Sequence, residues 1–165
     1  MKKPPTPYKL LPPEKRAALI TEMLTRHPTT RAAFIARLTS RKGGFRAQTF
    51  QPWPADKLAR EVVRVGAESV QDEVDLLQLL YVELEPAIQI TFLDAAGVRH
   101  TQGTMPEELS PPFADEAAVR RAVATVVAQH GEAADHYLLT LVTYARAGWP
   151  GIVEAVTAVK GTPGG

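Results

Sequence analysis

The sequence of 165 residues contains no cysteine. This absence excludes disulfide bonds, thiolate metal ligands and a cysteine nucleophile, and it suits a reducing compartment. A long apolar run is also missing, because the most apolar stretch, residues 74–84, is interrupted by Asp75, Gln78 and Glu83 and is too short to span a bilayer. The basic start is not followed by the apolar segment of a signal peptide. We therefore expect a cytoplasmic protein that does not enter a membrane.

Patterns typical of catalysis or metal binding are scarce. Paired carboxylates occur only at predicted helix starts or in connectors, where they compensate the helix dipole. His130, Glu132 and His136 could supply metal ligands, but Gly131 interrupts the helix between them, and a spacing of six does not place both histidines on one face. The serines lie outside any nucleophile-elbow context. We therefore expect a non-enzymatic protein with no catalytic residue, metal or cofactor.

Charge is distributed unevenly along the chain, although its net charge is only +1. Residues 1–64 contain 14 Lys and Arg against 4 Asp and Glu, a net charge of +10. Residues 65–165 contain 5 against 14, a net charge of −9. Such asymmetry is typical of a basic face for nucleic acid. It is equally typical of complementary surfaces that meet within one molecule or between copies.

The chain is predicted to form one mainly helical domain. Residues 1–12, rich in lysine and proline, are predicted to be an extended basic arm. Residues 13–160 form the domain, and residues 161–165 form a disordered tail. Apolar periodicity and helix-end signals predict six to seven helices. These lie at about 13–26, from 30 through at least 38, and at about 54–65, 69–84, 115–130, 133–146 and 150–156.

Residues 87–104 are predicted to form a β-hairpin. Ile88, Ile90 and Phe92 alternate with other residues, as on one face of a strand. The sequence DAAG at 94–97 suits a turn closed by a left-handed glycine, and residues 98–104 would return beside the first strand. His100 would then lie opposite Phe92. The expected fold class is α+β, mainly α: a helical bundle with one β-hairpin.

A loop rich in arginine, lysine and glycine is the candidate binding site. Basic side chains neutralise phosphates, glycines let backbone N–H groups approach an oxyanion, and aromatic rings stack on bases. The candidate anion-binding residues are Arg37, Arg41, Lys42, Arg46 and Lys57, and the candidate stacking residues are Phe45, Phe50 and Trp53. The loop is not a P-loop, because no lysine followed by Ser or Thr comes after the second glycine.

Two functions remain open. The first is nucleic-acid binding through phosphate contacts by the basic N-terminal half. The helix, HPTT turn and helix that open the chain suit a helix-turn-helix, but GGFRAQTF is a poor recognition helix, so we expect an ordinary helical hairpin. The alternative is a protein-interaction or assembly subunit, a homo-oligomer included, whose basic half meets an acidic face. The residues predicted for that acidic face are Asp72, Glu73, Asp75 and Glu83.

Overall fold

The computed structural model describes residues 2–161. The chain divides into two compact units, residues 1–79 and 80–165. The first unit contains 14 Lys and Arg against 8 Asp and Glu, a net charge of +6, and the second contains 5 against 10, a net charge of −5. The two units therefore carry opposite net charge.

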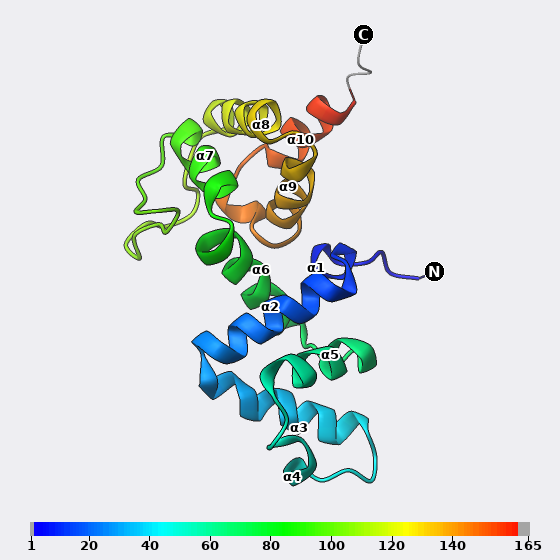
Figure 1. Cartoon of the computed structure of the whole chain (residues 1–165). Helices are drawn as coiled ribbons and strands as arrows, with labels where there is room; N and C mark the ends of the chain where they lie inside the picture. Colours follow the sequence, from blue (N-terminus) through cyan, green and yellow to red (C-terminus); the bar gives the residue numbers. More distant parts are fainter. Residues whose placement is uncertain (1, 162–165) are drawn as a thin grey trace. The chain divides into compact units, whose positions relative to one another are not determined.

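The first unit is helical throughout its regular structure (Figure 1). Its elements are α1 (Pro7–Leu10), α2 (Pro13–Arg26), the 3₁₀ turn η1 (Pro28–Thr30), α3 (Arg31–Arg41), α4 (Ala47–Phe50), α5 (Ala55–Val65) and α6 (Val70–Gln78). Helix α5 packs most extensively on α2 and also contacts α3. The core between these helices includes Leu19, Ile20, Leu38, Phe50 and Leu58.

The helix ends in the first unit follow the local sequence signals. Pro13 occupies the first turn of α2, where the missing N–H costs nothing. Gly66 ends α5 in the left-handed conformation at φ 65°. Ser69 and Asp72 form a capping box at the start of α6, where a helix start was predicted, and each side chain accepts a hydrogen bond from the other residue's backbone N–H. These predicted ends are confirmed.

The N-terminal segment differs from the extended arm that we expected. Residues 7–10 form the short helix α1, with Thr6 as its N-cap. Tyr8 is fully buried and its hydroxyl donates to the Glu68 carboxylate at 3.1 Å. Lys9 forms an ion pair with buried Glu73, 3.5 Å away. Buried Tyr8 and the ion pair of Lys9 are among the contacts that join this segment to α6 and to the residue Glu68 before it.

The second unit is also helical in its regular structure. The chain leaves α6 through a π-helical segment, η2 (Leu79–Leu84), in which Glu85 N–H donates to the Leu80 carbonyl. The remaining elements are α7 (Ala87–Ala96), α8 (Glu116–His130), α9 (Glu132–Tyr144), the 3₁₀ turn η3 (Arg146–Gly148) and α10 (Ile152–Lys160). Gly161 follows α10, and the other residues of the expected tail, 162–165, lie outside the described residues.

The predicted β-hairpin over residues 87–104 is wrong, because residues 87–96 form helix α7. Ile88, Phe92, Leu93 and Ala96 are buried, a spacing that lines one face of a helix and packs it against α8. The alternation of Ile88, Ile90 and Phe92 was compatible with both periods over so short a stretch. Gly97 is left-handed, as expected for DAAG, but at φ 72° it ends a helix rather than a hairpin turn.

The segment after α7 is a loop, and residues 2–161 contain no β-strand. Within this loop, Thr101 and Thr104 form an isolated β-bridge with two backbone hydrogen bonds of 2.9 and 3.0 Å. His100 does not face Phe92. Its Nδ1 accepts from Gly103 N–H at 3.1 Å, and its Nε2 lies 2.7 Å from an Asp94 carboxylate oxygen. The expected α+β class is therefore corrected to an all-helical fold over the described residues.

An aromatic cluster forms part of the core of the second unit. Phe92 is fully buried and makes edge contacts with Trp149, at 4.9 Å between ring centroids, and with Tyr137, at 5.8 Å. Phe113 covers Trp149 from the loop before α8. Val119, Val123 and other apolar residues of α8 are also buried in this unit. The ring of Phe92 thus joins α7 to α9 and to the segment before α10.

Among residues 2–161, no single helix is both long and apolar enough to cross a bilayer. Only residues 70–84 and 87–96 taken together pass a test of length and composition, and this pair is interrupted at Glu85 and Pro86.

Candidate functional site

The basic loop, residues 41–46, joins α3 to α4 (Figure 1). Phe45 N–H donates to the Lys42 carbonyl at 3.1 Å, which closes a tight turn with Gly43 and Gly44 at its two central positions. Gly44 has φ 93°, which an L-residue rarely adopts, and no heavy atom lies within 4 Å of a Cβ built on either glycine. The turn is therefore exposed, and it brings the residues before and after it close together.

Arg41 and Arg46 flank this turn, and both are exposed. Neither guanidinium has a hydrogen bond or an ion pair to another residue in the part of the chain that the structure describes. Each therefore retains its full set of N–H donors for an external anion. Of the five predicted cations, these two have no hydrogen bond, ion pair or ring contact within residues 2–161.

Arg37 and Lys42 instead make contacts within the protein. The Arg37 guanidinium donates to the Ala67 carbonyl at 2.9 Å, pairs with Asp72 and lies over the Phe34 ring at 4.9 Å. The Lys42 ammonium pairs with Glu61. Both side chains thus join α3 and its C-terminus to the helices packed on it.

Of the three predicted stacking residues, only Phe45 has an open ring. Its exposed fraction is 48%, whereas Phe50 is fully buried and Trp53 is partly covered. Phe50 contacts Trp53 edge-on, at 5.0 Å between ring centroids. Lys57 places its ammonium 4.2 Å from the Trp53 ring centroid, so this predicted cation covers an aromatic face. Phe50 therefore contributes packing beneath the basic loop rather than a surface for a base.

The four residues predicted for the acidic face have different surroundings in the structure. Asp72 caps α6 and pairs with Arg37, and Glu73 is buried beside Lys9. Asp75 is exposed and accepts from the Gln71 side chain at 2.8 Å. Glu83 is exposed and belongs to the second unit. Within the first unit, two of these carboxylates already neutralise basic residues of the same chain.

Glu61 is a residue that we did not predict from the sequence, and it organises the charges next to the basic loop. It accepts from Arg64 at 2.6 Å and pairs with Lys42. The hydrogen bond from Arg64 and the charge of Lys42 lower the pKa of the Glu61 carboxyl to about 2, although burial opposes the shift. The Arg64 pair follows from an i,i+3 spacing. The Lys42 pair is a long-range contact with no local signal.

Glu61 should make stability depend on pH in the acid range. Its pKa is lower in the folded chain than the ordinary value of 4.5, so its contribution is complete above that value and is lost as pH falls toward about 2. At neutral pH, Glu61→Gln should reduce the free energy of unfolding by about 1 kcal/mol, because the partner Arg64 is solvent-exposed. Urea titrations should show this difference shrinking below about pH 4.5. A difference that stays constant down to about pH 3 would contradict this role.

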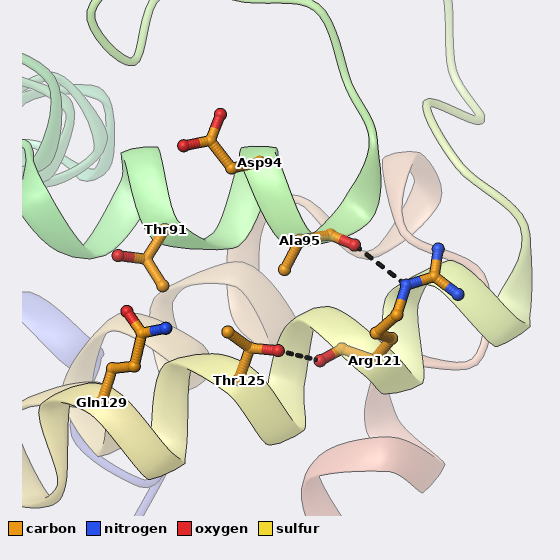
Figure 2. Close-up of a pocket in the computed structure, with 6 residues that line it drawn as sticks. All are labelled: Thr91, Asp94, Ala95, Arg121, Thr125 and Gln129. Carbon is orange, nitrogen blue, oxygen red and sulfur yellow. Dashed lines mark hydrogen bonds between the residues drawn. The ribbon is translucent and has the colours of Figure 1, made fainter.

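The second unit carries a shallow polar groove of about 400 Å³ between α7 and α8 (Figure 2). Its lining residues are Thr91, Asp94, Ala95, Arg121, Thr125 and Gln129. Arg121 Nε donates to the Ala95 carbonyl at 3.2 Å, near the end of α7, and Thr125 donates to the Arg121 carbonyl at 2.8 Å. Asp94 points away from α8 in Figure 2 and bonds to His100. Of these polar contacts, the bond from Arg121 joins the two helices, whereas the Thr125 bond lies within α8 and the Asp94 bond goes to the loop after α7.

Three of the four histidines, His100, His130 and His136, have hydrogen-bond partners among neighbouring side chains. His130 Nε2 lies 2.9 Å from the Thr91 hydroxyl, and His136 Nδ1 shares a hydrogen bond with the Tyr81 hydroxyl. His130 and His136, the two histidines of HGEAADH, therefore bond to residues of different elements, α7 and η2. Over residues 2–161, no group of three or more His, Asp or Glu side chains could hold a metal ion.

No protein-family model matches the chain, and neither a curated protein nor a solved structure matches it significantly. A function for this protein must therefore be inferred from the chemistry of its own side chains. The exposed cationic turn at residues 41–46 is the feature whose chemistry is least accounted for by internal contacts.

Proposed function

We propose that this chain is a non-enzymatic nucleic-acid-binding protein whose basic loop contacts backbone phosphates. The observation that carries the proposal is the pair of exposed arginines, Arg41 and Arg46, which flank a tight glycine turn and have no acceptor in the described chain. Arginine presents planar N–H donors that match phosphate oxygens. The net charge of +6 on the first unit would draw a polyanion toward this loop.

The mode of binding would be electrostatic, with little reading of base sequence. Each phosphate neutralised by an arginine releases condensed counterions, so affinity should fall steeply with added salt. The proposed phosphate-binding site contains fewer residues than the sequence predicted, because Arg37 and Lys42 form ion pairs with carboxylates of the same chain. Lys57 lies over Trp53 and could add a more distant positive charge. The cysteine-free composition suits a reducing compartment, so we place this function in the cytoplasm.

The test is a salt titration with labelled oligonucleotides, followed by fluorescence anisotropy. The double variant Arg41→Gln/Arg46→Gln should bind about tenfold more weakly than the original chain at about 50 mM salt. On single strands, its plot of log affinity against log salt should be shallower by about 1.4, since each lost phosphate contact contributes about 0.7. Both changes have the same cause, the loss of two phosphate contacts.

The matched control removes the same charge from the same unit. Arg26→Gln/Arg60→Gln changes two exposed arginines that already pair with Glu22 and Asp56 on their own helices. Its affinity should stay within about twofold of the original, because these cations are already neutralised. Equal losses in both double variants would show that only overall charge matters. No binding by the original chain at low salt would overturn the proposal.

The second candidate function is assembly through complementary charge. It is favoured by the opposite net charges of the two units, +6 and −5, which allow the basic surface of one copy to meet the acidic surface of another. Light scattering over a range of protein concentrations should then reveal association that salt disrupts. Association of this kind, without oligonucleotide binding, would favour assembly over nucleic-acid recognition.

A further inference from the structure

We propose that Phe45 is a base-stacking platform, and that it makes the basic loop prefer single-stranded nucleic acid to a duplex. This inference rests on the proposed function, because it adds a selectivity to the same loop. Phe45 is one of three large apolar side chains that are strongly exposed in the described chain, with Leu10 and Val70. Of the three, only Phe45 is aromatic and lies between exposed arginines that have no acceptor.

The ring of Phe45 is exposed but is held in place. It contacts Phe50 with ring centroids 6.0 Å apart and planes tilted by 37°, and Phe50 is itself fully buried. The Lys42 ammonium lies 5.1 Å from the Phe45 ring centroid and is held by Glu61. These contacts support the ring from within the unit and leave about half of the side chain open. A partly immobilised ring loses less conformational entropy when a base stacks on it.

The selectivity follows from which parts of a nucleic acid each side chain can reach. Arg41 and Arg46 can bind phosphates of a single strand or of a duplex, because phosphates are exposed in both. The face of a base is available only in a single strand, since duplex bases are stacked on one another. A duplex would therefore engage the arginines alone, whereas a single strand would engage the arginines and Phe45 together.

The experiment compares a single strand of about 15 nucleotides with the matching duplex, using DNA and RNA versions of each. Phe45→Leu removes the ring but keeps an apolar contact with Phe50. It should weaken single-strand binding by about tenfold and change duplex binding by less than about twofold. If Phe45→Leu weakens the binding of single-stranded DNA alone, or of single-stranded RNA alone, that nucleic acid is the ligand. Phe45→Trp should retain single-strand affinity, and the fluorescence of its added indole should be quenched by the oligonucleotide.

Leu10→Ala is the matched control, because Leu10 is an apolar side chain of the same unit with 52% exposure. Its affinity for every oligonucleotide should equal that of the original chain. Equal weakening of single-strand and duplex binding by Phe45→Leu, or no weakening of either, would overturn the stacking role. If Arg41→Gln/Arg46→Gln still loses affinity in that case, the phosphate-binding function survives. If the original chain binds neither probe, both proposals fail.

Discussion

Replacing Phe92 by alanine should lower the free energy of unfolding of the second unit by about 3–5 kcal/mol. The side chain is fully buried and contacts Tyr137 and Trp149 edge-on. Its removal loses the transfer free energy of the ring and leaves a cavity between helices that cannot fully collapse. The measurement is urea denaturation followed by the fluorescence of Trp149, in a Trp53→Phe background that leaves one tryptophan in the second unit.

The control for this result is the same substitution at an exposed site. Phe45→Ala removes an identical side chain that is 48% exposed in the first unit, so its cost should be less than about 1 kcal/mol, as followed by Trp53 fluorescence in a Trp149→Phe background. A loss below about 1 kcal/mol for Phe92→Ala would contradict the packing of α7 against its neighbours. Such a result would also support an extended conformation of this segment, which the alternation of Ile88, Ile90 and Phe92 favours.

Arg37→Ala should destabilise the first unit by about 2–3 kcal/mol and leave nucleic-acid binding almost unchanged. The variant removes a hydrogen bond to the Ala67 carbonyl, an ion pair with Asp72 and a cation–π contact with Phe34. It also leaves the partly covered Asp72 carboxylate without its cation, which costs more than the pair contributes. Urea denaturation followed by Trp53 fluorescence, in a Trp149→Phe background, reports on this unit.

Arg41→Ala serves as the comparison, because Arg41 is exposed and has no partner in the described chain. Its effect on stability should stay within about 0.5 kcal/mol. The affinity for oligonucleotides should show the opposite pattern. Under conditions where both variants are folded, Arg41→Ala should weaken binding and Arg37→Ala should not. If Arg37→Ala weakens oligonucleotide binding and leaves stability unchanged, Arg37 contacts the nucleic acid, as the sequence predicts.

The helix ends and the candidate binding site differ in how far they could be predicted. Pro13, Gly66 and the pair Ser69 and Asp72 act within one helical turn, so their effect can be read from neighbouring residues. The charged residues cannot be assigned in this way. Arg37, Lys42 and Arg41 lie within five positions of one another, yet the first two reach carboxylates on other helices and the third remains exposed.

The sequence by itself determined that the chain is mainly helical, most helix ends, the excess of basic charge toward the N-terminus and the presence of a glycine-containing loop. These depend on local conformational preference and on composition. Only the tertiary structure decided that residues 87–96 are helical, because burial of Phe92 and Leu93 against other elements overrides a short alternating pattern. It also decided which cations stay free, because a partner such as Glu61 is supplied by a segment distant in the chain.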